Sequence, residues 1–434
     1  MRLAFVSPLP PAPTGIADYS ADVLALLAGG HALDVFHGQE AIDRSRLPVD
    51  CGVFPARDLL ARHGETPYDL VVHQLGNNTA HLFQYDLLAR VPGLLVLHDL
   101  VLFHSRASAF LDAGPVRAWR AAPDSAEARA AARPVLDAWL EELEYSYPGR
   151  GRRLYEAHLG SAGTLLPYAY PLFRLPVEAS CAVVVHNEFM ARAVRAEVPL
   201  AEVAVVPQPV ERLDVAPQAV SALRARLGFG PGDVVVGVFG LLTPEKRVDT
   251  VAHAMAQAVR RNPALQLLLV GPVPPRAGLE SRLDGAGLNG RWRIAGRVPL
   301  DQLSAHIEAA DVVVHLRYPS GRETSAALLR VLAQGRAAIV SDLEHQSELP
   351  DGAVRRISLV DEHDQLLAAL LGLAGDPAAR SRLGRAAAEH VRVAHAPDRV
   401  RQAWERALAR SFPDPPVRDW PAHWPRPARR QRES

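Results

Sequence analysis

Short runs of apolar residues recur along the chain and alternate with stretches of helical periodicity. These runs are rich in Val, Leu and Ile, and in the first half they lie at Leu3–Val6, Leu33–Phe36, Leu70–Gln74, Leu94–Leu97, Ala182–Val185 and Val203–Val206. In the second half they lie at Val234–Phe239, Leu265–Val270, Trp292–Ala295, Val312–Leu316, Ala338–Val340 and Val354–Ile357. Near-continuous apolar strands are typical of a parallel sheet covered on both faces, and their alternation with helices indicates βαβ units. The pattern therefore predicts an α/β protein with two doubly wound parallel-sheet domains.

Breaks in this pattern divide the chain. We expect a first Rossmann-like domain over 1–210 and a second over 233–395, joined by a linker over 211–232 that holds a short helix and a glycine turn. The segment at about 103–175 is rich in Ala and Arg and shows no convincing strand, so it predicts a helical insertion in the first domain. A further helix is expected over 396–411.

Composition excludes several classes of protein. The 434 residues carry 48 Lys+Arg and 48 Asp+Glu, and a nucleic-acid-binding protein usually shows a basic excess. Two distant cysteines, Cys51 and Cys181, cannot form a disulfide framework or a cysteine zinc cluster. No uninterrupted apolar stretch reaches the length of about 18 residues that suggests a membrane span, so we expect a cytoplasmic protein. The Pro- and Arg-rich tail over 412–434 contains Trp420 and Trp424; it is compatible with peripheral contact to an anionic inner membrane face, or with a solvated, disordered arm.

Lys246 is the single lysine among the 48 basic residues. Where arginine serves everywhere else, a remaining lysine suggests a place where a compact ammonium cannot be replaced by a planar guanidinium. Chance survival of one lysine is the alternative.

The residues around Lys246 favour a role for this lysine in binding a ligand. The strand at Val234–Phe239 ends in Gly240, and Thr243 is a plausible N-cap with proline at the first helical position. Lys246 and Arg247 then fall in the first helical turn, whose positive end disfavours cations unless an anion is present. Two cations beside helix N–H groups are typical of a diphosphate site, and a solvated charge pair is the alternative.

Other strand ends also carry polar residues, and ligands of open α/β sheets bind at the carboxyl ends of the strands. In the first domain a Pro-rich loop delivers Gly15 to a helix N-terminus, where a ligand could approach the backbone closely. The pairs Asn77-Asn78, His98-Asp99 and His186-Asn187 follow later strands and together predict a polar cleft. An ordinary turn glycine and structural histidines are the alternatives.

A second helix N-terminus follows the strand at Val312–Leu316. Thr324 and Ser325 can cap this helix or donate to phosphate oxygens, and Gly335 is expected as its C-terminal cap. Glu323 is an acceptor suited to sugar hydroxyls, with a simple helix-dipole partner as the alternative.

Together these segments resemble the retaining glycosyltransferases of the GT-B fold, specifically glycosyltransferase family 4, over nearly the whole chain. The resemblance rests on RLAFVSPLPPAPTGIADYS, VLHDLVLFH, GLLTPEKRVD, LLLVGP, RIAGRV and LRYPSGRETSAALLRVLAQGRAAIVSD. It implies two Rossmann-like domains that face a central cleft, with the last helix crossing back to the first domain.

The resemblance also implies residue roles. Lys246, Glu323 and His98 would be catalytic: Lys246 neutralises the leaving diphosphate, Glu323 binds sugar hydroxyls, and His98 touches the donor sugar or the acceptor. The donor-binding residues would be Gly15, Gly240, Arg247, Gly296, Arg297, Val298, Arg317, Thr324 and Ser325. Gly296-Arg297-Val298 would meet the base through backbone groups. Two positions depart from the family: its usual arginine is Leu241 here, so that Arg247 or Arg317 would supply the charge, and its second, ribose-binding glutamate is Val331.

We therefore expect a hexosyltransferase-like enzyme that moves a sugar from a UDP- or GDP-linked donor to a carbohydrate or lipid acceptor with retention, as in polysaccharide biosynthesis. It would need no metal and no cofactor. A catalytically inactive GT-B protein that binds a sugar nucleotide or a partner is the alternative. A phosphorylase is disfavoured because only Lys246 could carry pyridoxal phosphate, and a dehydrogenase because no G-x-G-x-x-G follows a strand.

Overall fold

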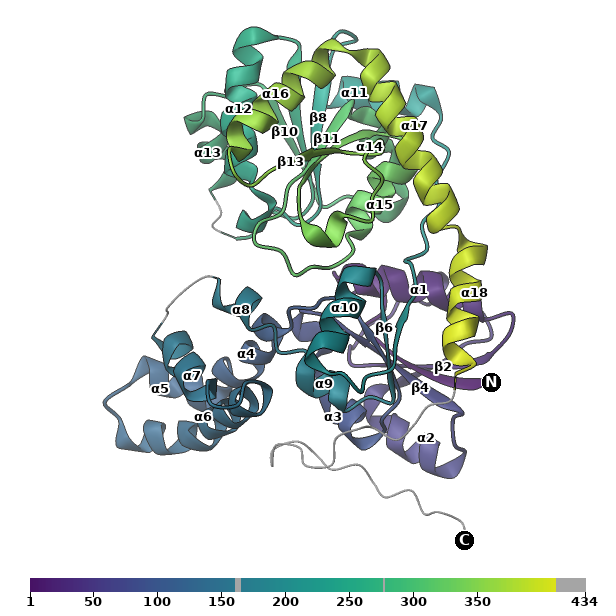
Figure 1. The fold of residues 1–434 in the computed structure, drawn as a ribbon, viewed down its shortest axis with the longest axis vertical. Helices are drawn as coiled ribbons and strands as arrows, with labels where there is room; N and C mark the ends of the chain where they lie inside the picture. The colour runs from purple at the N-terminus through teal and green to yellow at the C-terminus, as the bar shows by residue number, and fades with distance from the viewer. Residues whose placement is uncertain (161–164, 276–277, 411–434) are drawn as a thin grey trace. The chain divides into compact units, whose positions relative to one another are not determined.

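The computed structural model describes residues 1–160, 165–275 and 278–410, which form two compact units (Figure 1). Among the described residues, unit 1 comprises those in 1–209, the short loop 321–324, and 400–410. Unit 2 comprises residues 210–320 and 325–399. The tail predicted from 412 lies outside the described residues.

The sheet of unit 1 has seven parallel strands in the order β3-β2-β1-β4-β5-β6-β7. Their bounds are β1 Arg2–Val6, β2 Ala32–His37, β3 Gly52–Pro55, β4 Leu70–Leu75, β5 Leu94–Leu97, β6 Ala182–Val185 and β7 Val203–Val205. Six of them coincide with predicted runs. The strand β3 is the one that periodicity misses, because its four residues are all only half-buried and end in a proline at the sheet edge.

Alternate strand residues of unit 1 face two helical layers. On one face, Leu3 and Phe5 share a core with α1 (Gly15–Leu27) and with Trp404 of α18 (Pro397–Leu408). The remaining helices of the domain proper are α2 Leu59–Glu65, α3 Phe83–Arg90 and α10 Glu188–Glu197. α3 and α10 pack on the other face. The C-terminal helix α18 is therefore part of the core of unit 1.

Helices α4 to α9 fill the predicted insertion, and its described residues contain no strand. Their bounds are α4 Phe103–Leu111, α5 Gly114–Ala121, α6 Ala126–Ser146, α7 Gly151–Leu159, α8 Leu166–Ala169 and α9 Arg174–Glu178. Most of them share a separate core around Trp139, which is fully buried. A buried ion pair, in which Arg106 Nε lies 2.7 Å from Glu142 Oε1, joins α4 to α6.

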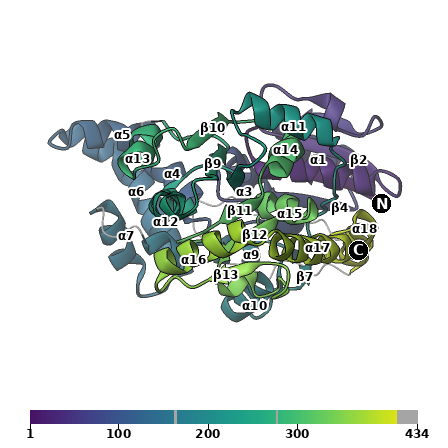
Figure 2. The ribbon, with the colours of Figure 1, turned by 90° about the horizontal axis from the view of Figure 1, so that it is seen from above.

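The sheet of unit 2 has six parallel strands in the order β10-β9-β8-β11-β12-β13. Their bounds are β8 Val234–Phe239, β9 Leu265–Val270, β10 Trp292–Gly296, β11 Val312–His315, β12 Ala337–Ser341 and β13 Arg355–Ile357, which match the predicted runs. The helices are α11 Pro217–Arg226, α12 Val248–Arg261, α13 Leu279–Gly285, α14 Leu300–Ala309, α15 Ala326–Ala333, α16 Glu362–Gly375 and α17 Pro377–Ala394. Figure 2 shows α12, α13 and α16 to one side of β11 and β12, and α14, α15 and α17 to the other. Each unit is thus a doubly wound, Rossmann-like domain, as predicted.

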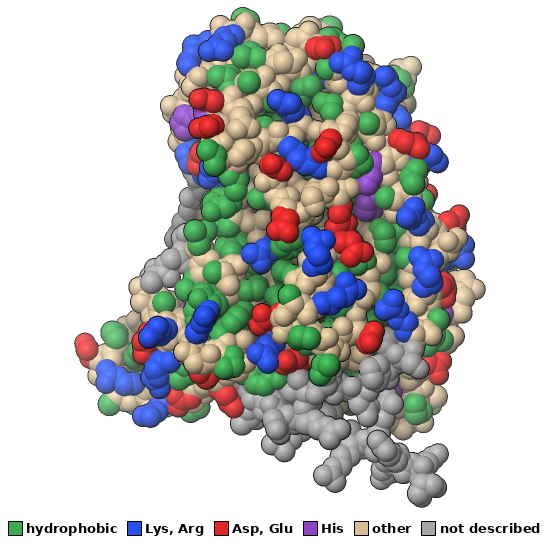
Figure 3. Space-filling view, in the orientation of Figure 1, with side chains coloured by type: hydrophobic (Ala, Val, Ile, Leu, Met, Phe, Trp, Pro, Cys, Tyr) green, Lys and Arg blue, Asp and Glu red, His purple; other side chains and the backbone are tan. Residues whose placement is uncertain are grey.

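Surface composition agrees with the zero net charge. On the face drawn in Figure 3, basic and acidic side chains are interspersed, with no large area of one sign. None of the described helices is long and apolar enough to cross a membrane.

Candidate functional site

A glycine stands at the carboxyl end of each of three adjacent strands of unit 2. Gly240 follows β8, Gly271 follows β9 and Gly296 ends β10, with φ of +103°, +147° and +67° respectively, in the region that favours glycine. Gly240 N donates to Val270 O at 2.9 Å, and Gly271 N donates to Gly296 O at 2.8 Å. A Cβ added to Gly271 would overlap the carbonyl oxygen of Gly240. The carboxyl ends of these three strands therefore carry no side chain at Gly240, Gly271 or Gly296, and we call them the glycine edge of unit 2.

Sequence reasoning selects Gly240 and Gly296 but misses Gly271. The signal was present, because Gly271 directly follows the apolar run Leu265–Val270 in the segment LLLVGP. The close approach of its Cα to Gly240 could not be seen without the structure.

Lys246 lies against this glycine edge. Lys246 is only 2 % exposed. Its Nζ donates to the carbonyl oxygen of Phe239 at 2.9 Å and lies 3.4 Å from Nδ1 of His315. A Cβ on Gly240 would be 3.3 Å from Nζ, so Gly240 also leaves room for the ammonium. The expectation that Lys246 and Arg247 fall in the first turn of the long helix is wrong. Residues 244–246 form a single 3₁₀ turn, and α12 starts only at Val248.

His315 ends β11 beside this ammonium and was not predicted. It is 1 % exposed, and burial, followed by the charges of Lys246 and Arg317, holds its pKa well below the ordinary value of histidine. The imidazole is therefore neutral near pH 7 and can accept from Lys246. Its place at a strand end was the available signal.

The predicted donor residue Arg247 has an anionic partner within unit 2. Its Nε and Nη2 lie 2.9 and 2.7 Å from Oε2 of Glu362, which is 6 % exposed at the start of α16. Arg247 itself is in the left-handed region, with φ of +57°. The argument that an unneutralised cation here calls for a phosphate is thus wrong for Arg247, because Glu362 already neutralises it.

The loop after β11 is tied to the loop after β8. Tyr318 N donates to the carbonyl oxygen of Glu245 at 2.9 Å. The half-buried Arg317 is fixed through its backbone N, which donates to Ser341 Oγ at 3.0 Å. Ser325 caps α15 by accepting from Leu328 N at 3.3 Å, as predicted. Within unit 2, the start of the loop after β11, as far as Ser320, therefore lies beside the loop after β8 that carries Lys246.

Glu323 and Thr324 lie in the short loop that groups with unit 1. Thr324 Oγ1 accepts from Asn187 Nδ2 at 3.0 Å, and its carbonyl oxygen accepts from Gln208 Nε2 at 3.2 Å. Glu323 is half-buried and lies three residues before α15. Asn187, which also caps α10, is thus a positioning residue for this loop.

His98 sits in a buried network at the strand ends of unit 1. It is 4 % exposed; Nε2 lies 2.8 Å from Gln74 Oε1, and Nδ1 lies 3.1 Å from His186 Nε2. The ring of Tyr19 meets it edge-on at 4.7 Å. Burial, and then His186 and His81, hold the pKa of His98 well below its ordinary value. Both nitrogens of a neutral ring therefore have protein partners, and a contact to sugar would have to replace one of them.

The other predicted binding residues are more accessible. Gly15 is exposed at the start of α1, where Thr14 accepts from Ile16 N at 3.3 Å, and a Cβ on Gly15 would meet nothing within 4 Å. Packing of the chain therefore does not require glycine there. Arg297 is exposed, and Val298 packs partly against the core of unit 2.

Metal ligands do not gather in the part of the chain that the structure describes. Over residues 1–160, 165–275 and 278–410, no group of three or more His, Cys, Asp and Glu side chains is placed to hold a metal ion.

Comparison with known proteins assigns this architecture. Residues 233–376, which include the glycine edge and Lys246, match the family model "Glycosyl transferases group 1". The 2-deoxystreptamine glucosyltransferase of Streptomyces kanamyceticus is 33 % identical over 113 residues, 25 % of this chain and 29 % of that protein. The D-inositol 3-phosphate glycosyltransferase of Nocardia farcinica is 29 % identical over 218 residues, 47 % of each chain. The chain thus spans less than half the length of these curated relatives.

Solved structures match over most of the chain. HepE of Anabaena, in complex with UDP and glucose, has a TM-score of 0.63 at 15 % identity and covers 95 % of this chain and 100 % of its own. Sucrose-phosphate synthase of Thermosynechococcus elongatus has a TM-score of 0.63 at 18 % identity, with the same coverage. WaaG, a glycosyltransferase of lipopolysaccharide biosynthesis, has a TM-score of 0.59 at 14 % identity over 92 % of this chain and 98 % of its own. The fold is therefore that of the GT-B glycosyltransferases, and residues 233–376 match a glycosyltransferase domain.

Proposed function

We propose that the chain is a retaining glycosyltransferase that takes a sugar from a UDP- or GDP-linked donor and transfers it to an acceptor hydroxyl without a metal or organic cofactor. The observation that carries the proposal is the ammonium of Lys246 beside the glycine edge of unit 2. Its support outside this chain is that HepE was solved with UDP-glucose, and that a group 1 glycosyltransferase model covers the same edge.

The proposed chemistry follows from where charge develops. When the bond between sugar and diphosphate breaks, negative charge grows on the leaving oxygen and positive charge on the sugar carbon. Lys246 would stabilise the leaving diphosphate, and its ammonium is already positioned by Phe239 O and needs little reorganisation. Glu323 would accept from donor-sugar hydroxyls, and those bonds strengthen as the sugar becomes oxocarbenium-like.

Protein cations would take the role that Mg²⁺ takes in metal-dependent transferases. Arg317, on the loop after β11, would be a second cation for the diphosphate. Arg247 would not be one, because Glu362 neutralises it.

The acceptor class is part of the proposal. The relatives are named for transfer to cyclitols, 2-deoxystreptamine and D-inositol 3-phosphate. We infer a polyhydroxylated acceptor, free or as part of a lipid or polysaccharide.

The test is a transfer screen with the full chain. UDP- and GDP-hexoses are each offered with inositol phosphate, 2-deoxystreptamine and simple glycosides, and products are identified by mass spectrometry and NMR. An α-linked product from an α-linked donor, formed equally in excess EDTA, is the expected result. Activity that is lost in EDTA and restored by Mg²⁺ or Mn²⁺ would contradict the metal-free mechanism.

A chain that binds UDP or GDP but neither transfers nor hydrolyses any donor would favour the inactive alternative. One observation favours that alternative: Val331 of α15, which stands where the resembling family has its ribose-binding glutamate, is fully buried in the core of unit 2.

A further inference from the structure

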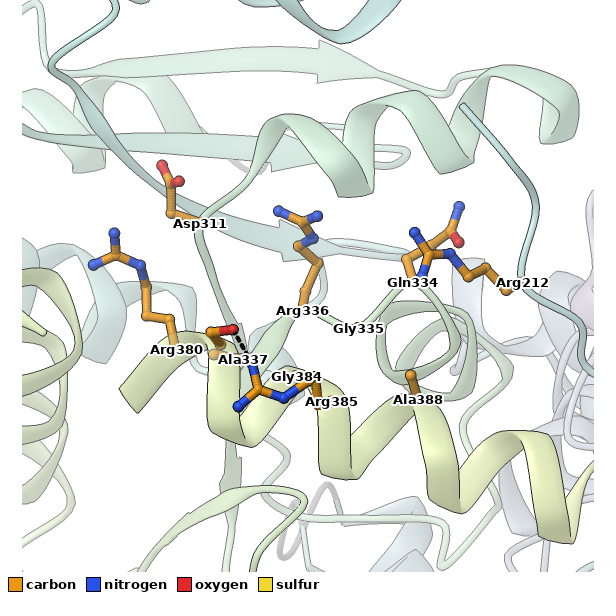
Figure 4. Close-up of a pocket in the computed structure, with 11 residues that line it drawn as sticks. Arg212, Asp311, Gln334, Gly335, Arg336, Ala337, Arg380, Gly384, Arg385 and Ala388 are labelled. Atoms are coloured by element: carbon orange, nitrogen blue, oxygen red, sulfur yellow. Dashed lines mark hydrogen bonds between the residues drawn. The ribbon is translucent and has the colours of Figure 1, made fainter. Parts of the chain in front are cut away.

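Unit 2 carries a pocket at the end of the sheet that lies away from the proposed donor site. Asp311 immediately precedes β11 and Ala337 begins β12, and both line this pocket (Figure 4). Because β12 has five residues, about 15 Å separates its amino end from its carboxyl end. Ligands of such sheets bind at the carboxyl ends, so this pocket is not part of the proposed donor site.

Two glycines form the floor of the pocket. The helix α15 ends in a Schellman motif, in which Gly335 N donates to Leu332 O at 2.9 Å and Arg336 N donates to Val331 O at 3.2 Å, with Gly335 at φ +69°. Gly384 of α17 packs on this turn so closely that an added Cβ would overlap the carbonyl oxygen of Gly335. The chain thus keeps side chains out of the floor and leaves a cavity of about 300 Å³, at the lower end of the range for small-molecule sites.

Four arginines surround this floor: Arg212, Arg336, Arg380 and Arg385. Figure 4 shows Arg380 and Arg385 on α17, and Arg336 and Arg212 on the facing segments. We call this arrangement the basic pocket.

The carboxylates around the basic pocket do not balance these charges. Glu308 pairs with Arg336 and lies 4.0 Å from Arg212, so two arginines share it. The lining residue Asp311 is already held by Arg224, whose Nη1 lies 3.1 Å from Oδ2.

The two arginines of α17 meet only neutral oxygens among the residues that the structure describes. Arg380 donates to the carbonyl oxygens of Leu373 and Ala374 at 2.6 and 3.0 Å, and Arg385 donates to Ser381 Oγ at 2.5 Å. Like charges gathered around a cavity repel one another and concentrate a positive potential within it. An anion bound in the cavity would relieve this repulsion.

We propose that the basic pocket binds a phosphate group, either as free inorganic phosphate or as the phosphomonoester of a small sugar. Guanidinium groups match phosphate oxygens in paired hydrogen bonds, which a lysine would not provide. The cavity is large enough for a small sugar phosphate. This proposal does not depend on glycosyl transfer.

A bound phosphate would also link two segments of unit 2. Arg212 lies two residues after the point where the chain enters the unit, and α17 leads to the point where it leaves. The entering segment is already bonded at two places: Val210 N donates to His395 O at 3.1 Å, and Gln334 Nε2 donates to Leu213 O at 2.9 Å. A ligand that bridges Arg212 and Arg385 would add a third link between the entering segment and α17. The phosphate compound bound there would therefore act as an effector of the protein.

The test is calorimetry on the full chain with inorganic phosphate, glucose 6-phosphate and, as the uncharged control, glucose. All titrations are run in the presence of saturating UDP, which occupies the proposed donor site. We expect one site per chain for a phosphate-bearing probe and none for glucose. Tighter binding of glucose 6-phosphate than of phosphate identifies the sugar ester as the ligand, and the reverse order identifies the free ion.

Three variants separate the basic pocket from general electrostatics. Arg212→Gln and Arg385→Gln should each weaken binding at least tenfold. Ala388→Leu fills the lining without changing any charge and should abolish binding. The matched control is Arg382→Gln on the same helix, whose side chain is 64 % exposed and lies outside the pocket. It should bind as the wild type does.

Hydrogen exchange supplies a second readout, since the ligand should slow exchange over residues 210–216. Several outcomes would overturn the proposal: no binding of either phosphate probe at millimolar concentration, equal weakening in Arg382→Gln, or undiminished binding in Ala388→Leu. Binding that appears only when UDP is left out would place the phosphate in the donor site and equally overturn it.

Discussion

The substitution Lys246→Met tests the donor site most directly, because it keeps the apolar stem and removes only the ammonium. In the structure this ammonium is buried, with Phe239 O at 2.9 Å. A charge-assisted hydrogen bond contributes about 1.5–3 kcal/mol. We therefore expect the dissociation constants of UDP and GDP to rise about 10- to 150-fold.

The same substitution should lower stability. A lysine in a first helical turn, as the sequence pattern suggests for Lys246, has little packing role and could be replaced at little cost to folding. Lys246 is instead buried, and its loss leaves Phe239 O without that donor, at about 1–3 kcal/mol for a buried polar group. Nucleotide affinity must therefore be measured at a temperature where circular dichroism shows the variant to be fully folded.

The assay is calorimetry with UDP and GDP, and the matched control is Arg261→Gln. Arg261 is an exposed cation in the last turn of α12, so its removal changes the net charge by the same amount at about 20 Å along the helix. The control should bind nucleotide as the wild type does. Unchanged affinity in a folded Lys246→Met protein, or equal loss in both variants, would refute the assignment of Lys246.

Three further predictions concern catalysis, backbone and pH. Glu323→Gln should lower kcat by about 10²–10³ with little effect on UDP affinity, the size expected when one transition-state stabiliser is lost; a variant that loses nucleotide binding instead would indicate a ribose-binding role. Gly271→Ala should lower the unfolding free energy by about 1–3 kcal/mol, since its φ is +147° and the added Cβ overlaps the carbonyl oxygen of Gly240. The control in urea denaturation is Gly372→Ala, whose added Cβ meets nothing within 4 Å and which should not destabilise. Burial lowers the pKa of His73 and of His81 to about 4, so the unfolded chain binds more protons than the folded chain between pH 6.5 and 4. The free energy of unfolding should therefore fall as the pH drops through this range, by about 2 kcal/mol for each histidine at pH 5. A denaturation midpoint that stays constant from pH 7 to 5 would contradict this.

The fold was predictable because hydrophobic pattern and chain connectivity act locally. Strands buried on both faces must be apolar throughout, and short loops with helices between them leave only parallel pairing. Local rules also placed the cap residues, since Ser325 accepts from Leu328 N and Gly335 takes the left-handed conformation. The strand β3 was not predicted, because its residues are only half-buried and its last residue is a proline, so that it lacks the continuous apolar run of the other strands.

The partners of the polar residues were not predictable, because they are distant in sequence. Arg247 and Glu362 are 115 residues apart, and His98 and His186 are 88 apart. Each pair is brought together by strands and helices whose relative register the sequence pattern does not encode. Sequence reasoning could therefore place these residues at sheet edges without showing that they satisfy one another.

Polar side chains and glycines at the strand ends differ in what they indicate about ligand binding. A polar side chain at a strand end has two possible fates: it bonds to another side chain, as His98 and Arg247 do, or it remains directed at the edge where a ligand binds. A glycine at a strand end has no side chain that could bond within the protein. Where such a glycine has a positive φ and no packing contact requires it, the position is suited to a ligand that approaches the backbone closely. Gly240 lacks a Cβ, which leaves room for the Lys246 ammonium at the end of β8. The proposed donor site therefore rests on the glycines and on Lys246, since His98 and Arg247 already have partners within the protein.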